Sequence, residues 1–122
     1  MKFCWITINV KDMEKSLDFY RGIVGLPLNR RFKASPDVEL SFLGKGDTQV
    51  ELICNAKNGE SGFGKDISLG FEVPSLEEVT GVLKDKNIPV IAGPLQPNPT
   101  VRFIYVLDPD GLKIQFVENL EH

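Results

Sequence analysis

The sequence is built on a repeated pattern. The stretch ITINVKDMEKSL, which starts at residue 6, returns in kind as LGFEVPSLEEVT, which starts at residue 69. In each copy, alternating apolar residues precede a helix N-cap and then an amphipathic helix. The copies begin roughly half a chain apart, so two versions of one supersecondary unit fill the sequence. The fold is therefore expected to consist of two similar modules, and a site can form where they face each other.

The first copy predicts the order β-α-β-β-β. Residues 3–10 alternate between an apolar face and a second face that carries Trp5 and Thr7, which is typical of a strand. Asp12 is a suitable N-cap, and Gly25 with Pro27 ends the helix. Three further strands are expected near residues 28–32, 38–43 and 48–54.

The second copy predicts the same order. A strand at residues 68–73 precedes a helix that opens with a capping box, Ser75 and Glu78. A strand begins at residues 89–91 and is followed by a proline-rich loop at 93–100. The last two strands, residues 102–107 and 112–117, form a hairpin around the turn DPDG.

These elements predict one domain over residues 1–119. Module 1 takes about residues 1–55, a polar, glycine-rich linker takes 56–66, and module 2 takes about 67–119. The final residues, 120–122, resemble the start of a vector-encoded polyhistidine tag and are expected to lie outside the native chain.

The composition restricts the function classes. The chain has 122 residues, a formal net charge of −3 and one histidine, His122. A negative balance argues against nucleic-acid binding, which needs a basic face. There is neither an apolar run long enough to span a bilayer nor a signal-peptide layout, so no membrane partner and a cytoplasmic location are expected. Cys4 and Cys54 lie in apolar strand patterns and are predicted to be buried, reduced thiols.

Four segments carry a resemblance to a known family: VKDMEKSLDFYRGIVGLPL, VELI, FEVPSLEE and DPDGLKIQFVE. Together they resemble the vicinal oxygen chelate superfamily, which includes glyoxalase I, extradiol dioxygenases, fosfomycin-resistance enzymes and bleomycin-resistance proteins. The resemblance implies an α+β fold. Two βαβββ modules would form a curled mixed sheet with a concave cup, and the helices would cover its outer face. It also implies a homodimer.

Metal-dependent members of this family hold a divalent ion with ligands on the first, fourth, fifth and eighth strands. Carried over, these positions are Trp5, Glu51, Ser68 and Gln115, and a shifted linker register would put Asp66 in place of Ser68. Indole nitrogen offers no lone pair, and one carboxylate with one amide oxygen is too few for a tight site. We therefore expect no metal or other cofactor, while weak binding of a divalent ion stays open.

Strand alternation places the four family positions opposite the apolar faces, so we expect them to line a ligand site. Glu51 is the candidate catalytic residue and Trp5 would stack on a flat ligand. Thr7, Ser68, Gln115 and Arg102 are the other candidate ligand-binding residues.

Plainer interpretations stay open for each of these positions. The face of a small sheet can simply be wet, and Trp5 can fill a core or a dimer contact. Arg102 and Tyr105 differ in strand parity, so only one of them can face the cup. Arg30, Arg31 and Lys33 are predicted to be a solvated strand edge.

Three functions follow from these observations. The first is metal-independent binding of a small organic ligand, aromatic or not, in the cup, as in the bleomycin-resistance branch. The alternative is a lyase or dioxygenase of the glyoxalase type that uses a divalent ion on atypical ligands, or a metal-free route with Glu51 as base. The third is a structural dimer with a vestigial cup.

Overall fold

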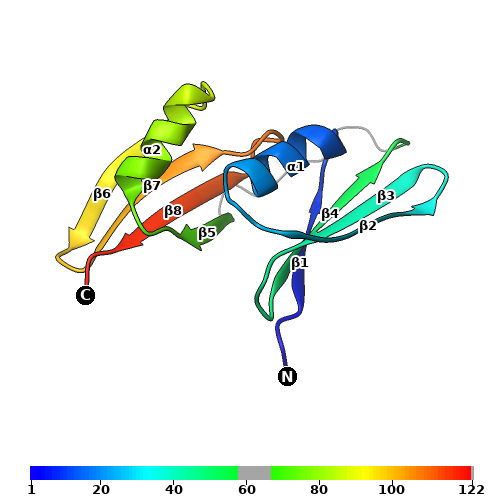
Figure 1. Ribbon diagram of the computed structural model, residues 1–122, viewed down its shortest axis with the longest axis horizontal. Helices are drawn as coiled ribbons and strands as arrows, with labels where there is room; N and C mark the ends of the chain where they lie inside the picture. Colours follow the sequence, from blue (N-terminus) through cyan, green and yellow to red (C-terminus); the bar gives the residue numbers. More distant parts are fainter. Residues whose placement is uncertain (58–66, 122) are drawn as a thin grey trace. The chain divides into compact units, whose positions relative to one another are not determined.

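The computed structural model describes residues 1–57 and 67–121, which belong to two compact units, Met1–Gly62 and Phe63–His122 (Figure 1). The first unit contains β1 (Trp5–Asn9), α1 (Met13–Gly22), β2 (Leu28–Ser35), β3 (Val38–Leu43) and β4 (Gln49–Asn55). The second contains β5 (Ser68–Glu72), α2 (Leu76–Asp85), β6 (Ala92–Asn98), β7 (Val101–Leu107) and β8 (Lys113–Asn119). The doubled β-α-β-β-β order is confirmed. Most of the expected linker, and Asp66 with it, lies outside the described residues.

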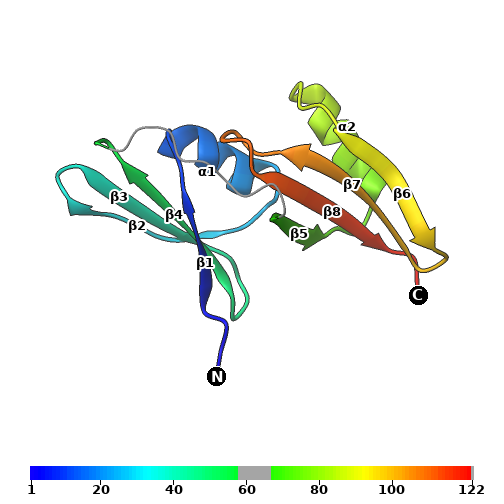
Figure 2. The same ribbon diagram turned by 180° about the vertical axis from the view of Figure 1, so that it is seen from behind.

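Each unit, called a module below, has one four-stranded mixed sheet (Figures 1 and 2). The strand order is β1-β4-β3-β2 in module 1 and β5-β8-β7-β6 in module 2. In both, the first strand runs parallel to the last, and the remaining neighbours are antiparallel. This repeated topology confirms the α+β fold class that the sequence predicted.

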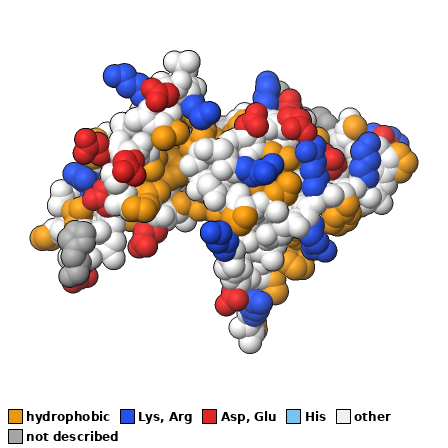
Figure 3. All heavy atoms as spheres, in the orientation of Figure 1, with side chains coloured by type: hydrophobic (Ala, Val, Ile, Leu, Met, Phe, Trp, Pro, Cys, Tyr) orange, Lys and Arg blue, Asp and Glu red, His pale blue; other side chains and the backbone are white. Residues whose placement is uncertain are grey.

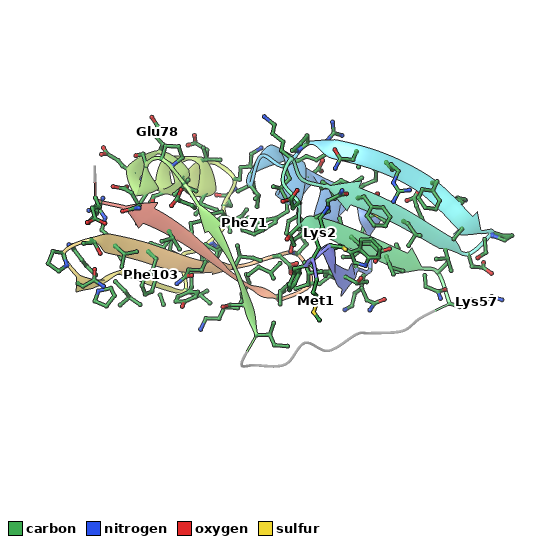
Figure 4. All side chains as sticks on the ribbon, turned by 90° about the horizontal axis from the view of Figure 1, so that it is seen from below. Met1, Lys2, Lys57, Phe71, Glu78 and Phe103 are labelled. Carbon is green, nitrogen blue, oxygen red and sulfur yellow. The ribbon has the colours of Figure 1, made fainter. Side chains whose placement is uncertain are left out.

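One helix covers one face of each sheet, for the same local reasons in both modules. The Asp12 side chain accepts a 3.1 Å hydrogen bond from the amide of Lys15 and begins α1, and Ser75 caps α2 in the same way. The apolar sides of the helices bury Leu17, which is 3% exposed, and Leu83, which is 1% exposed. The opposite side of α2 faces away from its sheet, as the Glu78 side chain shows in Figure 4.

The turn between β7 and β8 is organised by a buried aspartate. Asp108 is 4% exposed, and its Oδ1 accepts 2.9 Å hydrogen bonds from the amides of Asp110 and Leu112. Gly111 has a φ of +91°, which a residue with a side chain rarely adopts. The DPDG sequence therefore works as the predicted turn because a short acidic side chain satisfies its backbone amides.

Residues 92–98 form a strand, β6, where the sequence predicted a proline-rich loop at 93–100. Its pairing with β7 is irregular and has two register shifts between Ala92 and Asn98. Because β6 lies at the edge of the sheet, only one side of it needs hydrogen bonds. Pro94 and Pro97 therefore do not exclude a strand there.

Two further expectations concern the surface. The prediction that both cysteines are buried is wrong: Cys4 is exposed just before β1, and Cys54 is half-buried near the end of β4. Neither helix among the described residues is long and apolar enough to cross a membrane. Acidic and basic side chains are interspersed on the face drawn in Figure 3.

Candidate functional site

The face of the module 1 sheet that lies away from α1, called the open face here, carries a row of four residues. The strand registers pair Thr7 with Glu51, Glu51 with Phe42, and Phe42 with Arg30. Residues paired directly across neighbouring strands lie on the same face. The row therefore crosses all four strands, from β1 through β4 and β3 to β2.

The polar end of this row is a hydrogen-bonded pair. Thr7 Oγ1 donates to Glu51 Oε1 over 2.6 Å. Oε2 of Glu51 has no hydrogen-bond partner within residues 1–57 and 67–121, and the side chain is half-buried. One oxygen of the carboxylate is thus held in place, while the other is available to a bound molecule.

Next to this pair lies a group of aromatic rings and one cation, contributed by β1, β3 and β2. The Trp5 ring meets the Phe42 ring edge-on, with centroids 5.8 Å apart, and Trp5 remains 52% exposed. Phe32 stacks beside Phe42 at 6.5 Å, and the guanidinium of Arg30 lies over Phe42 at 4.4 Å from its centroid. These neighbours cover Phe42, which is only 5% exposed although it lies on the open face.

The open face of module 2 carries a second polar group. Gln115 Nε2 donates a 3.1 Å hydrogen bond to the Tyr105 hydroxyl, and the Lys113 ammonium lies 4.1 Å from the centroid of the Tyr105 ring. Phe103, labelled in Figure 4, meets Tyr105 edge-on on the same strand. A Cβ at Gly70 would lie 3.1 Å from Gln115 Oε1, so the absence of a side chain there leaves room for the amide.

The two groups occupy equivalent positions in the repeat. In module 1, Thr7 pairs with Glu51, and Glu51 pairs with Phe42 on its other side. In module 2, Gly70 pairs with Gln115, and Gln115 pairs with Tyr105 in the same way. The module 1 version holds a carboxylate with a hydroxyl. The module 2 version replaces them with a neutral amide and a glycine. The repeated topology therefore carries different chemistry on the two faces.

Five of the six predicted site residues lie on the open faces of the two modules. Trp5, Thr7 and Glu51 come together on the open face of module 1. Ser68 lies with Gln115 on the open face of module 2, because Ser68 and Gly70 are two residues apart on β5. Whether the two faces form one cup, and whether Glu51 lies within reach of Gln115, stays a prediction.

Arg102 lies on the other side of the module 2 sheet from Gln115. It pairs across the strands with Glu118, and one guanidinium nitrogen lies 3.4 Å from Glu118 Oε1. That same carboxylate oxygen accepts a 2.7 Å hydrogen bond from the Leu76 amide at the start of α2. Arg102 therefore lies on the helix-facing side, contrary to its predicted role in ligand binding. Of Arg102 and Tyr105, it is Tyr105 that lies on the open face.

Arg30, Phe42 and Tyr105 were not among the predicted site residues. The prediction that Arg30, Arg31 and Lys33 form a solvated strand edge is confirmed, because all three are exposed on the edge strand β2. The prediction did not separate the two faces, between which these residues alternate. Alternation along residues 28–32 was the signal that could have separated Arg30 from Arg31.

The side chains at the family's metal positions do not suit a divalent ion. Trp5, Glu51, Ser68 and Gln115 lie on β1, β4, β5 and β8, as the resemblance implied. Trp5 has no lone pair to offer, and Glu51 is the one carboxylate in the set. No three His, Cys, Asp or Glu side chains gather into a metal-binding group within the part of the chain that the structure describes.

Comparison with known proteins agrees with the fold. Residues 2–116 match the family model described as the Glyoxalase/Bleomycin resistance protein/Dioxygenase superfamily. The lactoylglutathione lyase of Neisseria meningitidis serogroup A is 34% identical over 98% of this chain and 91% of its own length. A probable lactoylglutathione lyase of Synechocystis sp. is 35% identical, over 92% of this chain and 91% of its own.

Solved structures share the fold at lower identity. The trypanothione-dependent glyoxalase I of Leishmania major is 22% identical with a TM-score of 0.83, covering 97% of this chain and 86% of that one. TnmS3, an antibiotic binding protein from a Streptomyces species, is 21% identical with a TM-score of 0.74, covering 98% and 96%. From the match to the family model and the curated relatives, this chain belongs to the Glyoxalase/Bleomycin resistance protein/Dioxygenase superfamily.

Proposed function

We propose that this protein is a glyoxalase-type lyase that acts on a small carbonyl compound without a metal ion at the family positions. The observation that carries the proposal is the Thr7–Glu51 pair on an open sheet face. It occurs in a chain that is 34% identical, over 98% of its length, to a lactoylglutathione lyase.

The relatives favour a lyase over metal-independent binding, the first of the functions expected from the sequence. The relatives from Neisseria and Haemophilus influenzae are named lactoylglutathione lyase, and the one from Synechocystis is named probable lactoylglutathione lyase. A shared fold alone would not choose between these functions, because one fold supports many sites. The choice therefore depends on what Glu51 can do.

Glu51 suits a proton transfer. A carboxylate can take a proton from a carbon next to a carbonyl group and return it to a neighbouring atom of the same molecule. The Thr7 hydroxyl fixes Oε1, so Oε2 is the oxygen that would meet the substrate. Such a step needs no external oxidant or reductant, because the proton and the electron pair stay within the substrate.

The test is an activity assay in the presence of a chelator. Tag-free protein is incubated with methylglyoxal and glutathione, and the lactoylglutathione thioester is followed by its absorbance. We expect turnover that a chelator does not remove and that Glu51→Gln lowers about 10²–10⁴-fold, the usual contribution of a general base. The exposed helix residue Glu77, changed to Gln, is the matched control. Turnover that is lost with the chelator and restored by a divalent ion would contradict the metal-free route.

A second candidate is metal-independent binding of a small flat molecule without turnover. It is favoured by Trp5, whose ring is 52% exposed beside Phe42. An exposed indole supplies a large apolar surface for stacking. Binding of aromatic compounds that quenches Trp5 fluorescence, together with no turnover of any carbonyl substrate, would favour this function over the lyase.

The homodimer implied by the family resemblance is part of the proposal. A second copy could complete the site or cover apolar sheet surface. Light scattering on the purified protein measures the assembly directly, and a monomer at all concentrations would exclude a dimeric site.

A further inference from the structure

We propose that Arg30 binds a carboxylate group of the ligand, so that the ligand of the module 1 site is a small organic anion. This inference deepens the proposed function and rests on the open face of module 1 being the site. It assigns a role to a residue that the resemblance does not point to, and it names the ligand class as a 2-hydroxy or 2-oxo carboxylic acid.

The first support is that Arg30 is held on the aromatic rings of the open face. Its Cζ lies 4.4 Å from the centroid of Phe42 and 5.7 Å from that of Phe32. A guanidinium that lies over an aromatic face is attracted to the ring and keeps its N–H groups for other partners. The rings thus limit the movement of the guanidinium without using its hydrogen-bond donors.

The second support is that the charge of Arg30 has no carboxylate partner within the described residues, whereas that of its neighbour does. Arg31 lies on the opposite face and pairs with Glu39 and Glu14. These two hydrogen-bonded carboxylates raise the pKa of Arg31. The acidic side chains near this strand therefore pair with Arg31, and the exposed guanidinium of Arg30 is left to solvent or to a ligand.

The third support is the position of Arg30 relative to Glu51. The guanidinium lies over Phe42, and Phe42 pairs directly with Glu51 on the adjacent strand. A ligand on the open face beside the exposed guanidinium would thus have a cation on one side and the Thr7–Glu51 pair on the other. Guanidinium binds carboxylate with two parallel hydrogen bonds, while Glu51 can accept a hydrogen bond from a hydroxyl.

This arrangement suits a molecule with a carboxylate next to a hydroxyl or carbonyl carbon. The carboxylate would meet Arg30, the adjacent hydroxyl or acidic carbon would meet Glu51, and an apolar substituent would contact Trp5. Arg30 is exposed, so a neutral ligand would leave its guanidinium to water, whereas a carboxylate would add a charge-assisted pair to the binding free energy.

The experiment compares two matched probes by calorimetry or by backbone amide NMR. Mandelate has a ring, a 2-hydroxyl and a carboxylate, and mandelamide is its neutral counterpart. We expect mandelate to bind about tenfold or more tightly than mandelamide, as a charge-assisted bidentate pair implies. Arg30→Gln should remove that preference, and Arg30→Lys should restore only part of it because an ammonium lacks the planar fork.

The matched control is Lys33→Gln. This substitution changes the net charge by the same amount as Arg30→Gln. Lys33 lies on the same strand as Arg30 but on the opposite face, where it pairs across the strands with Glu39. It should leave the preference for mandelate unchanged. Circular dichroism of each variant confirms that the fold is kept.

Three results would overturn the proposal. They are equal affinity of the wild type for the two probes, no binding of mandelate up to about 10 mM, and an equal effect of Lys33→Gln and Arg30→Gln. The lyase assay separates this inference from the proposed function. Turnover that is unchanged in Arg30→Gln would contradict the role of Arg30 and leave the lyase proposal intact. Arg30-dependent binding of mandelate without any turnover would contradict the lyase proposal and leave the role of Arg30 intact.

Discussion

Thr7 Oγ1 donates a 2.6 Å hydrogen bond to Glu51 Oε1 across the parallel pair β1 and β4. The equivalent pair in module 2 is Gly70 and Gln115, which cannot form such a bond because glycine has no side chain. The two modules share a topology, but only module 1 has a hydroxyl-held carboxylate at this place. The proposed chemistry therefore belongs to module 1.

The first prediction concerns the charge of Glu51. Glu51→Gln keeps the size of the side chain and removes its charge and its ability to act as a base. We expect ligand binding or turnover to be abolished, while the free energy of unfolding stays within about 1 kcal/mol of the wild type. Chemical denaturation and the lyase assay measure the two effects. Full ligand affinity in the variant would disprove the assignment of this site.

The second prediction concerns the hydroxyl of Thr7. Thr7→Val removes the hydrogen bond but keeps the branched shape, whereas Thr7→Ser keeps the hydroxyl. Since a neutral donor to a carboxylate contributes modestly, we expect Thr7→Val to weaken kcat/KM or affinity by about 3- to 30-fold. Thr7→Ser should stay near the wild type. Equal losses in both variants would mean that the methyl group matters and the hydroxyl does not.

The third prediction concerns Leu17 and Leu83, which are 3% and 1% exposed at the centres of the two helix–sheet contacts. Truncation of either to alanine should lower the free energy of unfolding by about 2–5 kcal/mol, as for other buried leucines. Val82→Ala is the control, because Val82 is 40% exposed on α2. Losses below about 1 kcal/mol at both leucines would contradict the assigned helical faces.

The fourth prediction concerns Gly70 and Gln115. In Gly70→Ala the new Cβ would lie 3.1 Å from Gln115 Oε1, so the flexible amide must move and its hydrogen bond to Tyr105 should weaken. We expect the side-chain amide signals of Gln115 to shift in NMR spectra. Tyr105→Phe removes the same hydrogen bond without steric pressure and should shift those signals too. Unmoved signals in both variants would show that the pair does not persist in solution.

The fifth prediction concerns metal ions. A micromolar site in the presence of millimolar metal would stabilise the protein by about 4 kcal/mol. Because Trp5 and Ser68 stand at two family ligand positions, we expect no such stabilisation of tag-free protein by Zn²⁺ or Ni²⁺ in thermal unfolding. Elemental analysis should find far less than one equivalent. A stoichiometric metal ion bound through Glu51 and Gln115 would overturn this expectation.

The local features of the fold were predictable from the sequence. The helix starts at Asp12 and Ser75, the DPDG turn and the alternation along β1 and β4 all depend on residues close together in the chain. Such signals are local because caps, turns and the two-residue period of a strand are set by neighbouring residues. The same alternation correctly placed Thr7 and Glu51 on the face opposite the helix.

Edge strands were harder to predict. The prolines in residues 93–100 favoured a loop, yet β6 pairs irregularly with β7 at the edge of its sheet. An edge strand needs hydrogen bonds on one side only, so its sequence can contain residues that a central strand excludes. Whether a proline-rich segment becomes an edge strand depends on the neighbour that pairs with it.

The sequence by itself determined the repeated module, its helices and the alternation that puts Glu51 and Thr7 on an open face. Only the tertiary structure decided which side chains meet there. The register of β2, β3 and β4 brings Arg30 over Phe42 beside Glu51, and the register of β7 and β8 gives Tyr105 to Gln115 and Arg102 to Glu118. The physical reason is that strand register depends on hydrogen bonds and packing between segments far apart in the chain, and a shift of one residue would exchange the two faces.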